Sequence, residues 1–230
     1  MKNYLRILLL AGSLAAGAAS AHTTDDPLLF SMAADISWQE DDQAALEGDL
    51  WLGRDLRKVW LKFDLEHADG ELEEAELQAL YGIAVAPYWD LQFGLRQDVR
   101  PRPTNTWGVL ALQGVAPYFV DTDLALFVGE GGAVAARLAF EYELLFTQDL
   151  SLSPAVELEL HGQNDRDTGM GSGLSEIEVG LRLSYQILKE LVPYVGVEYS
   201  KKFGNTADFS RLADEETSDT SWVIGLSFWF

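Results

Sequence analysis

The chain has 230 residues, with 16 Lys or Arg against 37 Asp or Glu, a formal net charge of −21 and no cysteine. The acidic balance argues against nucleic-acid binding, because neutralising phosphates requires basic side chains. The lack of cysteine excludes a disulfide scaffold and any thiolate metal site. The length is enough for one sizeable domain, and the hydrophobic content of 48% is too high for intrinsic disorder.

Residues 1–21 have the pattern of a secretory signal peptide. Lys2 and Arg6 precede a short apolar stretch that ends in the cleavage motif Ala19-Ser20-Ala21. The alternative, a membrane anchor helix, needs a longer apolar run. We therefore expect removal of residues 1–21, a short N-terminal segment over 22–27 and a single domain over 28–230. An exported chain without cysteine suits the periplasm or outer membrane of a diderm bacterium.

The rest of the chain alternates between apolar and polar residues with a period of two, which predicts β-strands. In the last segment Trp222, Ile224, Leu226 and Phe228 share one face. Most segments are about ten residues long or a little longer, the length that a tilted strand needs to cross a bilayer. Twelve segments are predicted, near 28–38, 45–53, 57–66, 72–85, 88–98, 106–115, 118–128, 133–146, 150–161, 174–187, 191–204 and 219–230.

The connections between these segments alternate in length. Tight turns are predicted at 53–56, 85–88, 116–118, 147–149 and 188–190, and looser polar loops at 39–44, 99–105, 162–173 and 205–218. Short turns at one end and longer loops at the other are typical of an all-β transmembrane, antiparallel up-and-down barrel. With twelve strands both termini lie at the short-turn end, which is the periplasmic side.

A soluble lipocalin-like barrel is the competing fold, because it alternates too but places its apolar residues inside. Alternation alone does not distinguish inside from outside. Three features favour the membrane barrel: the chain ends on the aromatic Phe230, aromatic residues gather near the segment ends as an interfacial girdle would, and twelve strands are too many for a lipocalin.

In a membrane barrel the polar face of each strand lines the lumen, and here acidic groups outnumber basic ones. The acidic lumen residues that we single out are Glu141, Glu143, Glu157, Glu159, Glu178 and Glu198. One interpretation is a solvated wall with crossed ion pairs, since lumens are polar. The other is a surface that attracts cations, because a narrow acidic cleft focuses the electrostatic potential.

Side chains that bind soft metals are scarce beyond residue 21. The candidate metal ligands are His22, His67, His161, Met32 and Met170. Imidazole and thioether groups suit copper. His161 and Met170 flank the 162–173 loop and are predicted to meet at the outer rim. Each candidate also has an ordinary interpretation, as a polar rim histidine, a loop methionine or a residue beside a cleavage site.

Catalysis finds little support in the sequence. A hydrolase needs a nucleophile, a base and an orienting group brought together, and no motif marks His161 and Ser172 as such a pair. We therefore predict no catalytic residues and no enzymatic activity.

Several stretches resemble the copper-resistance protein B family of outer-membrane proteins, and they follow one another in the same order. Three of them read RKVWLKFDLE (57–66), AELQALYGIAVAPYWDLQFGLRQD (75–98) and TWGVLALQGVAPYFVD (106–121). Four more read ARLAFEYELLFTQDLSLSPAVELEL (136–160), GSGLSEIEVGLRLSYQI (171–187), PYVGVEYSKKFGNTAD (193–208) and the terminal FWF. The resemblance covers about residues 28–230.

The resemblance implies an outer-membrane barrel that contacts outer-membrane lipid and helps the cell to tolerate copper, with copper ions as the bound or transported ligand. It also implies a periplasmic multicopper oxidase and copper carrier proteins as partners. Members of the family often carry a Met- and His-rich segment before the barrel, where this chain has only HTTDDP (22–27). No metal ligand of the family is therefore carried over.

Three other functions remain open on the sequence. A general small-solute porin or structural barrel would have no metal role. An outer-membrane hydrolase would need a Ser–His pair on the lipid-facing surface. A docking platform for a periplasmic partner would place its determinants in tight turns such as Arg54-Asp55 and Lys189-Glu190.

Overall fold

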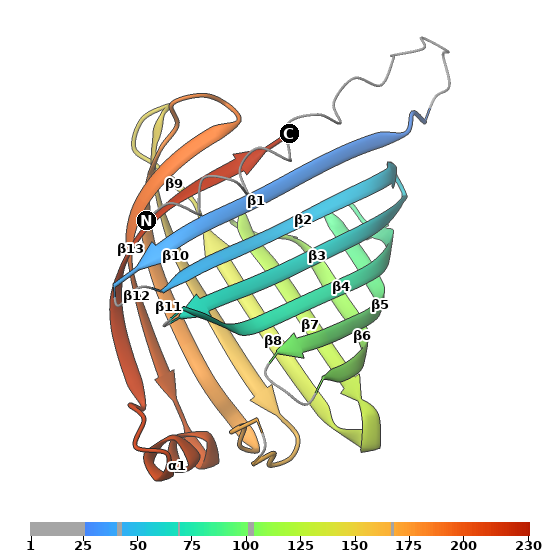
Figure 1. Ribbon diagram of the computed structural model, residues 1–230. Coiled ribbons are helices and arrows are strands. Elements are labelled where there is room, and N and C mark those ends of the chain that lie inside the picture. The colour runs from blue at the N-terminus through green and yellow to red at the C-terminus, as the bar shows by residue number, and fades with distance from the viewer. Residues whose placement is uncertain (1–25, 41–42, 69, 101–103, 167) are drawn as a thin grey trace.

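The computed structural model describes residues 26–40, 43–68, 70–100, 104–166 and 168–230. The described chain is almost entirely antiparallel sheet, wrapped into a ring around a central space (Figure 1). The strands are β1 (Leu29–Gln39), β2 (Ala44–Arg54), β3 (Arg57–Ala68), β4 (Glu71–Ala86), β5 (Trp89–Arg100), β6 (Asn105–Ala116), β7 (Val120–Gly129), β8 (Val134–Tyr142), β9 (Leu144–Leu145), β10 (Leu150–His161), β11 (Gly173–Tyr185), β12 (Leu191–Lys202) and β13 (Ser218–Trp229).

The ring closes where the last strand meets the first. β13 pairs antiparallel with β1, with Ala33 opposite Trp229 and Gln39 opposite Val223. The two-residue strand β9 continues β8 along the edge of β10. Counted together as one strand, β8 and β9 make this a twelve-stranded barrel. Each of the twelve predicted segments corresponds to one of these strands, and the prediction of a twelve-stranded antiparallel barrel is confirmed.

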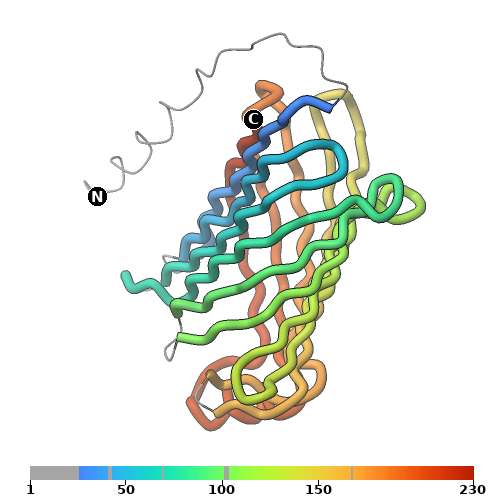
Figure 2. The backbone as a smooth tube through the Cα atoms, turned by 90° about the vertical axis from the view of Figure 1, so that its right-hand side faces the viewer, coloured from blue at the N-terminus to red at the C-terminus, as the bar shows by residue number. Residues whose placement is uncertain are grey.

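The two ends of the barrel differ in their connections. At one end, here called the turn end, β2 joins β3 through residues 55–56 and β4 joins β5 through residues 87–88. At the other end, the loop end, longer segments connect β10 to β11 and β12 to β13. Figure 2 shows the ring from the side, with the strands inclined to its long axis. In a barrel of this kind short turns face the periplasm and longer loops face outward.

The loop end carries two short helical segments: the 3-10 turn Glu130–Gly132 between β7 and β8, and the helix α1 (Gly204–Leu212) between β12 and β13 (Figure 1). The predicted polar loop over 205–218 does connect β12 to β13, but the sequence analysis did not foresee that it contains α1. This helix buries Thr206, Ala207 and Ser210 rather than large apolar residues, so hydrophobic periodicity gives no signal for it. None of the helices in the described ranges combines the length and apolar character needed to cross a bilayer.

The apolar face of the barrel strands points outward. Leu110 on β6 is 50% exposed and Trp222 on β13 is 66% exposed, whereas Gln92 on β5 is fully buried on the inner side. A lipocalin-like barrel would have the opposite arrangement. The structure thus settles the question that alternation leaves open, in favour of a lipid-facing apolar surface.

A small apolar cluster lies inside the barrel on the β3–β7 side. Its buried members are Trp60, Leu80, Val109, Ala111 and Phe127, and Trp51 and Trp107 pack against it. These side chains narrow the lumen because they project inward from β2, β3, β4, β6 and β7. We call this set the aromatic layer.

Candidate functional site

A cavity of about 900 Å³, which we call the acidic cavity, lies in the lumen. Seventeen Asp or Glu residues line it, against five Lys or Arg residues. The acidic residues are Glu47, Asp64, Glu66, Glu73, Glu74, Asp98, Asp121, Asp123, Glu141, Glu157, Glu159, Asp165, Glu176, Glu178, Glu198, Glu216 and Asp219. This excess of carboxylates within apolar walls creates a strongly negative potential that attracts cations.

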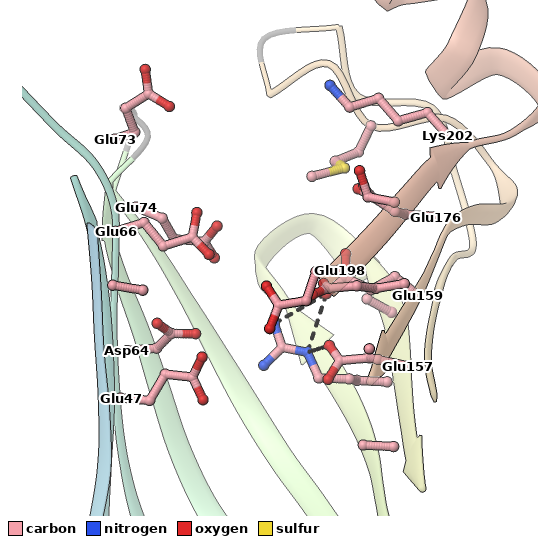
Figure 3. Close-up of a pocket in the computed structure, with 18 of the residues that line it drawn as sticks. Glu47, Asp64, Glu66, Glu73, Glu74, Glu157, Glu159, Glu176, Glu198 and Lys202 are labelled. Atoms are coloured by element: carbon pink, nitrogen blue, oxygen red, sulfur yellow. Dashed lines mark hydrogen bonds and ion pairs between the residues drawn. The ribbon is translucent and has the colours of Figure 1, made fainter. Parts of the chain in front are cut away.

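Two sides of this cavity face each other (Figure 3). Strands β2, β3 and β4 contribute one side, with Glu47, Asp64, Glu66, Glu73 and Glu74. Within the described part of the chain, none of these five carboxylates has a Lys or Arg within ion-pair distance. Asp64 Oδ1 is buried and has no hydrogen-bond partner among the described residues. We call this side the open wall.

The opposite side, which we call the paired wall, comes from β10, β11 and β12. Arg137 on β8 lies 3.1 Å from both Glu157 and Glu159, and it also contacts Glu76 at 3.3 Å. Arg182 on β11 holds Glu198 at 2.9 Å. Guanidinium groups thus neutralise much of the charge on this wall. Glu176 and Glu178 of β11 are the members without an ion pair among the described residues.

Cationic side chains border the aromatic layer as well. The Arg96 guanidinium lies 4.8 Å from the ring centre of Phe127, and Lys58 Nζ lies 5.3 Å from that of Trp51. These are cation–π distances. Arg96 is in turn held by Glu76 at 2.7 Å and Asp98 at 2.6 Å. In the narrowed part of the lumen these cations are therefore held by neighbouring carboxylates and aromatic rings.

A second cavity, of about 800 Å³, opens beside the turn end. It is lined by residues of β3 to β7 and their turns, among them Lys58, Trp60, Asp90 and Gln113. Lys58 and Asp90 form an ion pair at 2.6 Å. Asp121 on β7 lines both this cavity and the acidic one, so the two spaces adjoin at that carboxylate.

The predicted metal ligands fall in three different places. His67, His161 and Met170 all line the acidic cavity. Met32 lies on the outward face of β1, with the exposed Trp38. His22 and the predicted signal peptide lie outside the described residues. No group of three or more His, Asp or Glu side chains in the described ranges is arranged to hold a metal ion.

Of the predicted acidic lumen residues, five line the cavity: Glu141, Glu157, Glu159, Glu178 and Glu198. Glu143 does not. It lies between β8 and β9, exposed at the turn end where the strand is interrupted. Strict alternation placed it in the lumen because it shares the phase of Glu141, and the break after Tyr142 ends that phase.

Sequence reasoning missed Glu73. In the structure both Glu73 and its neighbour Glu74 line the cavity, whereas strict alternation allows only one of them to face the lumen. Two consecutive residues cannot face the same side of a regular strand. The register shifts between Glu66 and His67 and between Ala75 and Glu76, so bulges flank this part of β4. Bulges re-aim side chains in this way. Alternation could have predicted Glu66 and Glu176, since Glu66 shares a face of β3 with Asp64 and Glu176 shares a face of β11 with Glu178.

The comparisons with known proteins agree with this architecture. The model of the family described as "Copper resistance protein B precursor (CopB)" matches residues 31–230. The chain belongs to the copper resistance protein B family. The word "precursor" in the description fits a leader that is removed.

Two curated relatives carry the same name. The chain is 43% identical over 216 residues to "Copper resistance protein B homolog" of Pseudomonas syringae pv. tomato, an alignment that covers 92% of this chain and 74% of the relative. It is 38% identical over 198 residues to "Copper resistance protein B" of Escherichia coli, covering 85% of this chain and 67% of the relative. Neither name denotes an enzyme.

Solved porins share the fold. A NanC porin structure superposes with a TM-score of 0.55 at 13% identity, covering 87% of this chain and 99% of the porin. A KdgM porin structure gives a TM-score of 0.54 at 14% identity, covering 86% and 98%. At such low sequence identities the superpositions show a shared fold and nothing about function. Fold and family together place this protein in the outer membrane, in contact with lipid, with a role in copper resistance.

Proposed function

We propose that this barrel collects copper ions from the loop end and holds them in the acidic cavity, without catalysing a reaction. The observation that carries the proposal is the open wall: five carboxylates that face the cavity without basic partners among the described residues. A carboxylate that is not neutralised by an ion pair keeps its full attraction for a cation. The family supports copper as that cation.

Electrostatics explains why the open wall would bind an incoming cation and the paired wall would not. Two unit charges 4 Å apart interact with about 4 kcal/mol at the effective dielectric constant typical near a protein surface. On the paired wall much of that interaction is already taken up by Arg137 and Arg182. An incoming cation would have to displace a guanidinium there, whereas at the open wall it displaces only water.

The test is copper binding by the purified protein refolded in detergent micelles, titrated with Cu(II) and, as a control for selectivity, with Zn(II). A triple variant, Glu47→Gln, Asp64→Asn and Glu74→Gln, removes three charges from the open wall. We expect its Cu(II) affinity to fall about tenfold, which corresponds to ~1.4 kcal/mol.

A matched control removes the same charge elsewhere. The control triple is Glu143→Gln, Asp149→Asn and Glu190→Gln. All three residues lie at the turn end, and none of them lines the acidic cavity. This control triple is expected to keep the affinity of the unsubstituted protein. An equal loss in both triples would mean that net charge alone attracts copper, and the proposal would fail.

Passage of copper through the barrel is a second candidate function, favoured by the position of Asp121. This carboxylate lines both cavities, so a cation that reaches it from the loop end is next to the space that opens at the turn end. A periplasmic copper carrier or multicopper oxidase, the partners that the family resemblance implies, would meet the ion there. Planar-bilayer recordings test this: Asp121→Asn should reduce the selectivity for cations over chloride, and an unchanged selectivity would exclude Asp121 from the path.

A further inference from the structure

The ring of His161 is fixed in orientation by a chain of two hydrogen bonds. Its Nδ1 lies 2.9 Å from Ser175 Oγ, and Ser175 Oγ donates to the carbonyl oxygen of Gly171 at 2.8 Å. Ser175 is fully buried. A serine hydroxyl has a single hydrogen, and here the carbonyl takes it. Ser175 Oγ can therefore only accept from His161, which places a hydrogen on Nδ1.

This assignment of the hydrogen leaves the other ring nitrogen free. A neutral imidazole with its hydrogen on Nδ1 has its lone pair on Nε2. His161 lines the acidic cavity at the loop end of β10. Histidines that ligate metals almost always donate their second ring nitrogen to a neighbouring acceptor, which fixes the tautomer and the orientation of the ring. The hydrogen bond from His161 to Ser175 is such an interaction.

The same chain of hydrogen bonds leads to Met170. The carbonyl that accepts from Ser175 belongs to Gly171, the next residue after Met170. Met170 is further held through its own carbonyl, which accepts from the backbone N–H of Asp165 at 2.7 Å. Met170 and His161 line the same cavity. Of the three methionines in the sequence, Met170 is the one that lines this cavity in the described structure.

Helix α1 holds this corner in place. The Gly171 N–H donates to Thr206 Oγ1 at 2.8 Å, and Thr206 is buried. A β-carbon on Gly171 would lie 2.2 Å from the backbone nitrogen of Thr206, so only glycine permits this approach. Asn164 Oδ1 also accepts from Asn205 at 2.9 Å. The loop that carries Met170 is thus packed against a helix rather than free at the rim.

We propose that this corner of the rim is a Cu(I) site, with His161 Nε2 and the Met170 thioether as ligands and Ser175 as the residue that positions His161. Thioether groups select Cu(I), and imidazole suits copper. The inference rests on the proposed function, because it names the ion and the ligands with which the barrel would receive copper. A thioether ligand is also compatible with the lack of a group of three His, Asp or Glu side chains suited to a metal in the described ranges.

The first experiment measures Cu(I) affinity under anaerobic, reducing conditions, by competition with a chromophoric chelator. The protein is refolded in detergent micelles, and heat-modifiable mobility on gels confirms folding of each variant. Ser175→Ala is expected to lower the Cu(I) affinity about tenfold, the usual effect of losing a residue that orients a ligand, and Met170→Leu, which removes a ligand itself, by at least about as much. Met32→Leu is the matched control, since Met32 faces outward. His67→Gln provides a comparison with a second histidine of the same cavity, whose ring no hydrogen bond fixes in the described structure.

The second experiment does not involve copper and so separates orientation from binding. Nitrogen chemical shifts of 15N-labelled histidine distinguish a ring protonated at Nδ1 from one protonated at Nε2. We expect His161 to carry its hydrogen on Nδ1 and to lose that preference in Ser175→Ala. A ring protonated at Nε2 in the unsubstituted protein would overturn the inference, because the lone pair would then face Ser175.

The outcomes for the rim and for the cavity are distinguishable. If Met170→Leu and Ser175→Ala keep full Cu(I) affinity while the open-wall triple loses Cu(II) affinity, the rim site is refuted and the proposed function stands. If the open-wall triple has no effect while the rim variants lose Cu(I) affinity, collection by carboxylates fails and the rim site remains. His161→Gln, which removes the proposed imidazole ligand, should also lose Cu(I) affinity, and an equal loss in His67→Gln would refute the special role of the fixed ring.

Discussion

The open wall and the paired wall arise from the same sequence pattern and differ in their partners. Both present carboxylates at alternate positions of neighbouring strands, apart from the consecutive Glu73 and Glu74 of the open wall. On the open wall Glu47 and Asp64 have no basic residue within ion-pair distance in the described structure, whereas on the paired wall Arg137 reaches two strands at once. The comparison teaches that alternation assigns a residue to the lumen, while its charge balance depends on whether a neighbouring strand or the opposite wall places a basic side chain within reach.

Removing Arg137 should have the largest effect, because it would leave Glu157 and Glu159 of the paired wall without their guanidinium partner. Arg137 contacts Glu76, whose side chain is 3% exposed, together with Glu157 and Glu159. Removing one partner of a buried ion pair costs about 3–5 kcal/mol when the remaining charge is left without compensation. Glu76 keeps Arg96 at 2.7 Å, so the charges left without a partner are those of Glu157 and Glu159. We expect Arg137→Met to lower the free energy of unfolding by about that amount in urea titrations of the refolded barrel.

The control for this prediction is Arg54→Met. Arg54 is an exposed residue near the turn end, and its contact with Asp26 is 3.9 Å long. Exposed pairs of this kind contribute about 0–1 kcal/mol. If Arg137→Met were no more destabilising than this control, the paired wall would not be held together by its ion pairs.

The next largest effect concerns the aromatic layer that stands beside these charges. Phe127 is 3% exposed and contacts the guanidinium groups of Arg96 and Arg137. Phe127→Ala should destabilise the barrel by about 3 kcal/mol, from lost burial and the space left behind. The same space should raise the single-channel conductance, because the layer narrows the lumen. Leu126→Ala, on the outward face of the same strand, should leave the conductance unchanged.

Much of the fold could be predicted from the sequence, because a barrel strand repeats one simple rule. The predicted segment 57–66 corresponds to β3, and alternation correctly placed Glu157 and Glu159 in the lumen. The walls could not be assigned in this way. Lys62 pairs with Asp123, 61 residues away, and Gln39 bonds to Glu198, 159 residues away. Such contacts depend on the curvature of the closed ring, which no local pattern encodes.

The smaller departures have local physical causes. Consecutive Glu73 and Glu74 share the cavity because bulges interrupt the strand pairing nearby. Helix α1 was missed because its buried face is made of small and polar residues. The hydrogen bond between His161 and Ser175 was equally hidden, because His161 lies opposite Gly173 while Ser175 lies where the β10–β11 register shifts. The candidate site is thus specified mainly at places where the regular alternation breaks.

Ionic strength should have the smallest effect and should separate the open wall from the rim. The open wall attracts a cation through charges, and the Debye length falls from about 10 Å at 0.1 M salt to about 3 Å at 1 M. The proposed rim ligands, an imidazole and a thioether, are uncharged. Raising the salt from 0.1 M to 1 M should therefore weaken Cu(II) binding about threefold or more, while Cu(I) binding at the rim changes less. Parallel titrations of the two ions at both salt concentrations check this. Equal salt dependence for Cu(I) and Cu(II) would mean that a single set of charged ligands holds both, which would remove the distinction between the wall that collects copper and the rim that receives it.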